Sequence, residues 1–130
     1  MFNFASPRQT IHSFGASDCG RVQHIGKNWR IEKRNQIADL LFSSELDSWG
    51  NPKGIGLSMW RFNIGSGSHE AGDNGGVASL WRRAECFLDK EGDWDWDKQE
   101  GQRWMLQAAR ERGVRYSLGF SITAPYFMTK

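Results

Sequence analysis

The sequence has 130 residues and a formal net charge of +2, with acidic and basic residues interspersed. This length allows one ordinary domain with a modest core, and the mixed charge provides no basic face of the kind that binds nucleic acid. Seven tryptophans and eight phenylalanines exclude a disordered chain, and no apolar run approaches the roughly 20 residues that cross a bilayer. The N-terminal "MFNFASPRQT" lacks the basic start and long apolar segment of a signal peptide.

Strands and helices are predicted to alternate along the chain. Each predicted strand holds β-branched or aromatic residues between turn signals, and each predicted helix has apolar residues at helical spacing. In chain order these are a strand in 10–17, a helix in 29–46, a strand in 55–65, a helix in 97–113 and a strand in 115–123. The alternation predicts an α/β fold with parallel strands and right-handed crossovers.

Both predicted helices are amphipathic, and a short further helix is expected in 76–88. The first helix buries Ile37, Leu40 and Leu41, and the second buries Trp104, Met105, Ala108 and Ala109. Asp97 is expected to cap the second helix, with Glu100 completing a capping box.

The second strand contains an arginine, Arg61, within an apolar run, "SMWRFNIGSGS" at 58–68. Because side chains alternate along a strand, Met59, Arg61 and Asn63 share one face. The opposite face, with Trp60, Phe62 and Ile64, is expected to pack against helices. A buried arginine needs a partner, for which a carboxylate is best suited. Arg61 is therefore either a structural bridge to a neighbouring strand or part of a polar site.

Polar residues follow the first two strands, where parallel strands place ligand sites. Asp18 follows the first strand and is expected to contact a ligand or to cap a turn. The loop "GSGSHEAGDNGG" at 65–76 lacks the third glycine of a nucleotide-binding GxGxxG motif. It forms either a solvated loop or a ligand-facing one, in which Ser66, Ser68, His69, Glu70 and Asp73 offer polar contacts.

No metal or cofactor site is predicted. "DWDWDK" at 93–98 resembles the start of a calcium loop, but it has Lys98 at the required glycine and Trp104 at the required glutamate. The three histidines and two cysteines lack metal-site spacing. Cys19 and Cys86 are expected to be buried thiols, with a disulfide as the alternative.

The order and identity of these motifs resemble the N-terminal part of glycoside hydrolase family 30, nearest to its bacterial endo-β-1,6-galactanase-like branch and more distantly to glucosylceramidase. The segments that carry the resemblance are "FGASD" (14–18), "GIGLSMWRFNIGSGS" (54–68), "WRRAECFL" (81–88), "ERGV" (111–114) and "APYFMTK" (124–130). The resemblance implies a (β/α)₈ barrel with a β-sandwich side domain. Such a barrel needs roughly 250 residues, so the chain is expected to hold about three β/α units in 11–130, cut short after the third strand. Residues 1–10 are then a lead-in, with a strand of the side domain as one reading.

The resemblance also implies a retaining glycosidase, in which an acid/base and a nucleophile stand roughly 5 Å apart. Both are glutamates on strands four and seven in this family, so the catalytic pair is expected to lie outside this chain. Arg61 matches the arginine that keeps the nucleophile ionised, and Asp18 matches a substrate-contacting aspartate. Ser68 occupies a position where some relatives have a sugar-binding aspartate. Ile122 replaces an asparagine or aromatic residue, and so cannot hydrogen-bond a hydroxyl.

Taken together, the sequence predicts a fragment of a glycosidase that acts on a β-linked glycan, for which β-1,6-galactan is the preferred candidate. The fragment is expected to be inactive by itself. The expected partners are an oligo- or polysaccharide and the missing part of the barrel, and the intact protein is expected to be secreted, periplasmic or on the cell surface. A non-catalytic carbohydrate-binding module and a small interaction protein are the alternatives. The substrate-side residues expected to line the site are Asp18, Arg61, Asn63, Ser66, Ser68, Ile122 and Thr123.

Overall fold

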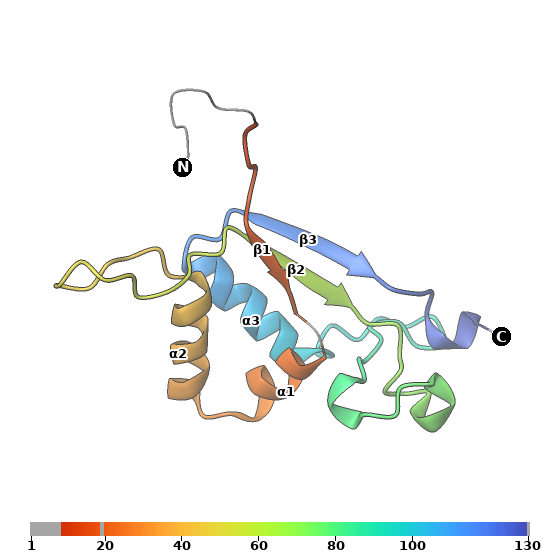
Figure 1. The fold of residues 1–130 in the computed structure, drawn as a ribbon. Helices are drawn as coiled ribbons and strands as arrows, with labels where there is room; N and C mark the ends of the chain where they lie inside the picture. Colours follow the sequence, from red (N-terminus) through yellow and green to blue (C-terminus); the bar gives the residue numbers. More distant parts are fainter. Residues whose placement is uncertain (1–8, 19, 130) are drawn as a thin grey trace.

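Three parallel strands form one sheet in the computed structural model, which describes residues 9–18 and 20–129. The strands are β1 (Gly15–Ser17), β2 (Met59–Ile64) and β3 (Tyr116–Ser121), in the order β1-β2-β3 (Figure 1). Arg61 stands opposite Ser17 on one side and opposite Leu118 on the other. All three predicted strands are confirmed, each somewhat shorter than the segment that predicted it. The lead-in predicted at 1–10 lies almost wholly outside the described residues.

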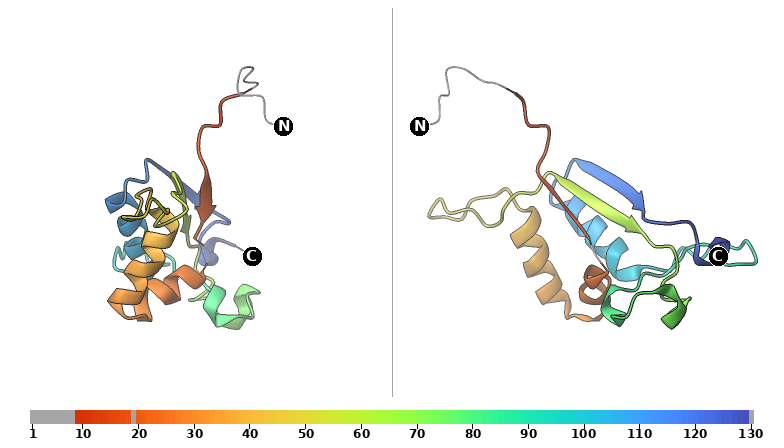
Figure 2. Two further views of the ribbon diagram at one scale, coloured as in Figure 1. Left: turned by 60° about the vertical axis from the view of Figure 1, so that its left-hand side comes forward. Right: turned by 45° about the vertical axis from the view of Figure 1, so that its right-hand side comes forward.

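Helices cover only one face of this sheet, as Figures 1 and 2 show. They are α1 (Arg21–Asn28), α2 (Ile31–Phe42) and α3 (Glu100–Glu111). The core lies between this face and the helices, and comprises Ala38, Phe42, Trp60, Met105, Ala108, Ala109 and Val114. The predicted packing face of β2 is thus confirmed at Trp60, although Ile64 at the end of the strand is exposed.

Helix α1 was not predicted from the sequence, because Gly26 lies inside it and glycine disfavours helix by roughly 1 kcal/mol relative to alanine. Tertiary packing explains the glycine. A Cβ atom at Gly26 would overlap the backbone of Gly101 in α3, and one at Gly101 would overlap the carbonyl of Gln23 in α1. The two glycines therefore let α1 and α3 approach backbone to backbone.

The predicted capping box of α3 is wrong. Gln99, with a φ of 54°, is the N-cap residue, and no side-chain cap bond is formed by it. The first-turn amides of Gly101 and Gln102 instead donate to Oε1 of Gln23, at 2.9 and 3.2 Å. A side chain 78 residues earlier in the sequence thus satisfies N–H groups that the helix leaves free.

The short helix expected in 76–88 is also absent; the segment holds one 3-10 turn, Leu80–Arg82. Backbone groups of the following residues are used by the 65–76 loop: Ala84 donates to Ser68 Oγ at 2.8 Å, and its carbonyl accepts from the His69 amide at 3.1 Å. These bonds compete with the backbone hydrogen bonds of a helix.

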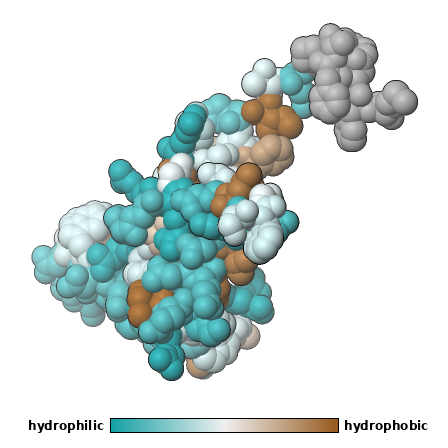
Figure 3. Space-filling view, turned by 90° about the vertical axis from the view of Figure 1, so that its left-hand side faces the viewer, coloured by the Kyte–Doolittle hydropathy of each residue, from teal (hydrophilic) through white to brown (hydrophobic). Residues whose placement is uncertain are grey.

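Leu40, expected in the core, is exposed because it lies on the outer side of α2. Figure 3 views the molecule from the left-hand side of Figure 1; this face is mainly hydrophilic, with separate hydrophobic patches.

The second face of the sheet is open. It carries Met59, Arg61 and Asn63 of β2 beside Tyr116, Leu118 and Phe120 of β3. The three β3 side chains are 39%, 48% and 39% exposed. A face of this kind usually packs against another layer, and no helix or strand of the described residues covers it (Figure 2).

Candidate functional site

A cavity of 660 Å³ lies at the carboxyl end of the sheet, between the loops that follow β2 and β3. Three of the predicted substrate-side residues, Ser66, Ser68 and Thr123, line it together. Glu70, Asn74, Tyr126 and Thr129 are further polar residues of its wall. The structure therefore brings these three predicted residues to one place, although 54 residues or more separate Thr123 from the serines along the chain.

The cavity wall is held in place by hydrogen bonds between the two loops. The Tyr126 amide donates to the Ser66 carbonyl at 2.7 Å, which fastens the end of the chain to the loop after β2. The Ser68 hydroxyl accepts from the Ala84 amide, and the Thr123 hydroxyl donates to the Ala124 carbonyl at 3.0 Å. The Ser66 hydroxyl makes no hydrogen bond to the described residues, so it is the most available of the three for a ligand.

Arg61 lies on the open face of the sheet, in β2, whose following loop lines the cavity. The guanidinium carbon is 3.7 Å from the centre of the Phe120 ring, and the Nε atom is buried without a hydrogen-bond partner in the part of the chain that the structure describes. No carboxylate of the described residues lies within 4.0 Å of the guanidinium nitrogens. The expected carboxylate partner is therefore not supplied by these residues.

Asp18 is fully buried at the end of β1. Its amide donates to the Arg61 carbonyl at 3.0 Å, its Oδ1 accepts from the Asn63 amide at 2.6 Å, and its Oδ2 accepts from the Gln102 side chain at 3.2 Å. Burial raises the pKa of Asp18 to about 6, although the bonds from Asn63 and Gln102 and the charge of Arg61 act in the opposite direction. The carboxylate thus joins the ends of β1 and β2 to α3.

Asn63 and Ile122 lie on either side of this network. Asn63 is half-buried, and its carbonyl accepts from Gln102 Nε2 at 3.3 Å. Ile122 is exposed just past the end of β3. Neither lines the cavity with the serines, so the seven predicted residues form two groups: the cavity wall, and the strand ends beneath it.

Sequence reasoning missed Gln102, and it named Glu70 only as one of several polar residues of a ligand-facing loop. Glu70 lines the cavity and accepts from Lys98 at 2.9 Å and from the Cys86 amide at 3.2 Å. This pairing raises the pKa of Lys98, first through its hydrogen bond to Glu70. Gln102 carried a usable signal: it precedes Met105 by three residues on the buried stripe of α3, and a buried amide requires partners.

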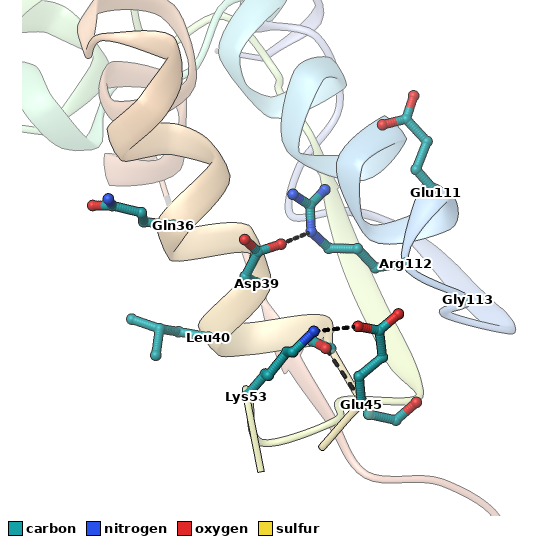
Figure 4. A pocket seen from close by; sticks show the side chains of 10 residues that line it. Gln36, Asp39, Leu40, Glu45, Lys53, Glu111, Arg112 and Gly113 are labelled. Atoms are coloured by element: carbon teal, nitrogen blue, oxygen red, sulfur yellow. Dashed lines mark hydrogen bonds and ion pairs between the residues drawn. The ribbon is translucent and has the colours of Figure 1, made fainter. Parts of the chain in front are cut away.

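Another cavity, of 830 Å³, lies at the opposite end of the sheet (Figure 4). Its rim is closed by two ion pairs, between Asp39 and Arg112 at 2.7 Å and between Glu45 and Lys53 at 2.8 Å. It is lined by α2, by the end of α3 and by the loops that follow these two helices. In barrel proteins this end stabilises the fold, whereas ligands bind at the carboxyl end, so we do not assign the site here.

No group of three or more His, Cys, Asp or Glu side chains suited to a metal ion occurs within residues 9–18 and 20–129. Cys86 is a buried free thiol, and Cys19 lies outside the described residues. No helix in the described ranges has the length and hydrophobicity to cross a membrane.

A parallel sheet with helices on one face and a polar cavity at its carboxyl end defines the class: an α/β protein built from the first units of a β/α barrel. The sequence profile of O-glycosyl hydrolase family 30 matches residues 1–130. The chain belongs to this family.

Two solved structures resemble the chain. A conserved exported protein from Bacteroides fragilis is 52% identical, with a TM-score of 0.89 over 94% of this chain and 25% of that one. An endo-β1,6-glucanase is 19% identical, with a TM-score of 0.62 over 97% of this chain and 25% of the other. The chain therefore spans about a quarter of the length of each. The comparison with curated proteins gave no match.

Proposed function

We propose that these residues form the first quarter of a retaining glycoside hydrolase that cleaves a β-linked glycan, and that they supply its substrate-side wall and not its catalytic pair. The observation that carries this proposal is the position of Arg61. Its guanidinium lies on the uncovered face of the sheet beside Phe120 and has a buried Nε without a partner among the described residues, on the strand whose following loop lines the cavity.

The open face supports a missing remainder of the protein. A closed barrel would pack Tyr116, Leu118 and Phe120 against side chains of later strands, in the layered interior that barrels share. It would also pair the free edges of β1 and β3, which the three-stranded sheet leaves without partners in the described chain. The solved relatives, about four times longer, have enough chain for such a remainder.

The carboxylates near the site are already engaged in holding the fold. Glu70 is paired with Lys98, Glu85 accepts from the Gln99 amide at 2.7 Å, and Asp18 is buried in its network. Retaining hydrolysis needs one carboxyl group free to attack and another free to move a proton. We infer that both come from strands beyond residue 130, and that Arg61 donates to the nucleophile and keeps it ionised.

The substrate-side residues have separate roles in this proposal. Ser66, Ser68 and Thr123 form the wall that contacts sugar hydroxyls. Asp18 is fully buried and acts by fixing the strand ends, whereas the half-buried Asn63 is accessible to a sugar. Ile122 offers an apolar contact instead of a hydrogen bond, which favours a sugar face without a hydroxyl at that point.

We take a β-1,6-linked galactan as the substrate. The sequence resembles the galactanase-like branch most closely, and the fold neighbour that acts on β-1,6-glucan shares the linkage but not the sugar. The 52% identical neighbour is an exported protein, which supports a secreted, periplasmic or cell-surface location for the intact protein.

The test is hydrolysis by a longer protein that carries these residues, with β-1,6-galactan, β-1,6-glucan and a β-1,4-glucan as substrates. Proton NMR of the first product should show the β-anomer, because two successive displacements retain configuration. Initial formation of the α-anomer would contradict the proposal. So would a failure to hydrolyse any β-linked glycan, whether one of these three or another.

A non-catalytic carbohydrate-binding module is the second candidate. It is favoured by one observation: Trp94 and Trp96 are exposed on a loop instead of buried. A longer protein that binds glycan without hydrolysing it would support this alternative.

A further inference from the structure

Two tryptophans stack on each other in the long segment between β2 and α3. The ring centres of Trp94 and Trp96 are 5.1 Å apart with an interplanar angle of 8°. The residues are 58% and 62% exposed. Phe87, which is buried, supports Trp96 from a centre-to-centre distance of 5.4 Å. The result is an aromatic surface that remains more than half exposed to solvent although the two rings stack on each other.

The segment that carries these rings is rigidly folded. Leu88 and Trp94 form an antiparallel bridge, and the Asp95 amide donates to the Phe87 carbonyl at 2.8 Å. The turn between them is closed by Asp89, whose Oδ1 accepts from the amides of Glu91 and Asp93 at 3.0 and 2.8 Å. The ring pair is therefore held in position before any ligand arrives, which lowers the entropy cost of binding.

The aromatic surface adjoins the candidate site. Trp94 lines a cavity of 150 Å³ together with Ile64, Ser121 and Thr123 at the ends of β2 and β3. Thr123 also lines the 660 Å³ cavity. The two cavities therefore adjoin at Thr123, and a chain-like ligand that lies in the larger one can continue over the tryptophans.

The charges around the rings restrict the ligand. Acidic residues flank the tryptophans on both sides, at Asp93, Asp95 and Asp97, with further acids at Asp89 and Glu91 and only two lysines, Lys90 and Lys98. Lys98 is paired with Glu70. Exposed carboxylates repel an anionic chain within a Debye length, roughly 8 Å at physiological salt, but accept hydrogen bonds from neutral hydroxyls.

We propose that Trp94 and Trp96 form a stacking site for a neutral sugar unit of a glycan chain, next to the cavity at the strand ends. The apolar C–H face of a pyranose ring packs on the indole surface, and its hydroxyls point toward the flanking carboxylates. The proposal rests on the proposed function, because the glycan is the substrate of that site. It adds a binding position remote from the reacting bond and selectivity against uronic and sulfated glycans.

The experiment compares Trp94→Ala and Trp96→Ala in the longer protein with Trp49→Ala. Trp49 is 87% exposed on the loop before β2, at the other end of the sheet, and is the matched control. Loss of a stacking ring is expected to lower kcat/KM for polymeric galactan about tenfold, and to lower it less for an aryl β-glycoside too short to reach the rings. Trp49→Ala should leave both unchanged.

Binding is measured in parallel by native gel electrophoresis through neutral galactan and through polygalacturonate. Retardation by galactan but not by polygalacturonate supports the proposal if it is lost in Trp94→Ala and Trp96→Ala. This support holds even if no hydrolysis is detected; in that case only the proposed function fails. Equal kcat/KM for the polymer in wild type and both variants overturns the inference and leaves the proposed function intact. Equal retardation by polygalacturonate overturns the inference too, because it would show no selectivity against acidic glycans. A lowered melting temperature or a changed oligomeric state of both variants, without a change in glycan binding, also overturns it and would assign the rings to protein packing.

Discussion

The guanidinium of Arg61 lies 3.7 Å from the centre of the Phe120 ring, and the two residues belong to neighbouring parallel strands. Arg61 stands opposite Leu118 in the register, so it reaches two residues further along β3 to meet Phe120. Its side chain therefore leans toward the carboxyl end of the sheet, where the polar cavity lies. An aromatic face holds the charge there without neutralising it.

Arg61→Lys in the longer protein tests the role of this charge. Lysine keeps the charge but loses the planar fork that bonds a carboxylate, so kcat should fall roughly a hundredfold, as when a preorganised donor is removed. The melting temperature should change little, because the contact with Phe120 contributes only about 1 kcal/mol. Arg115→Lys, exposed before β3, is the control. A kcat within twofold of wild type would show that Arg61 is a structural arginine.

Asp18→Asn tests the buried carboxylate through pH. The pKa of Asp18 is raised from 3.8 to about 6, so the folded state holds the proton more tightly than the unfolded state. The contribution of the bound proton to the free energy of unfolding is complete below about pH 4 and is lost as the pH rises through 6. The loss amounts to about 3 kcal/mol. Relative to Asp18→Asn, the wild type should thus lose stability between pH 4 and 6.

Urea unfolding of the purified chain at pH 4, 5, 6 and 7 measures this difference. Ser17→Ala, next to Asp18 and without a titratable group, is the control and should show a difference from wild type that does not vary with pH. A flat difference for Asp18→Asn as well would mean that the carboxylate is not buried in solution.

Gly101→Ala tests the contact between α1 and α3. Alanine favours helix by roughly 1 kcal/mol over glycine, but its Cβ would overlap the backbone carbonyl of Gln23. Separation of the helices should cost about 1–3 kcal/mol net and weaken the bonds from Gly101 and Gln102 to Gln23. Thermal unfolding measures the loss, with the exposed Arg110→Ala in the same helix as control. A stabilised Gly101→Ala variant would rule out the close approach.

The open sheet face predicts that the isolated chain self-associates. Tyr116, Leu118 and Phe120 present apolar surface beside an unpaired strand edge, which favours edge-to-edge or face-to-face pairing. Sedimentation velocity should show dimers or larger species that Leu118→Lys reduces. Leu46→Lys, at a leucine that is more exposed than Leu118 but lies outside the sheet, should not reduce them. A chain that melts cooperatively as a monomer would favour the small interaction protein instead.

The sequence predicted what depends on local pattern. The strands around Ala16, Arg61 and Leu118, and the helices that bury Ala38 and Met105, followed from alternation and helical spacing. Features that depend on distant partners were missed. Gln23 caps a helix 78 residues away, and α1 contains Gly26 because α3 leaves no room for a side chain there.

The site was predicted in part for the same reason. Ser66, Ser68 and Thr123 were placed together because carboxyl ends of parallel strands meet at one edge. The burial of Asp18 depends on Gln102, which comes from a helix 84 residues later. The stacking of Trp94 on Trp96 depends on the neighbouring turn closed by Asp89, whereas the sequence of 93–98 suggested only a comparison with a calcium loop.

Hydrolysis of an aryl β-glycoside by the purified chain tests most directly whether the catalytic pair lies elsewhere. The chain of 130 residues should release no more aryl alcohol than buffer alone, while a longer protein that carries it should turn the substrate over. Turnover by the chain itself, abolished by Glu70→Gln or Glu85→Gln, would place the reacting carboxylates within these residues and contradict the account.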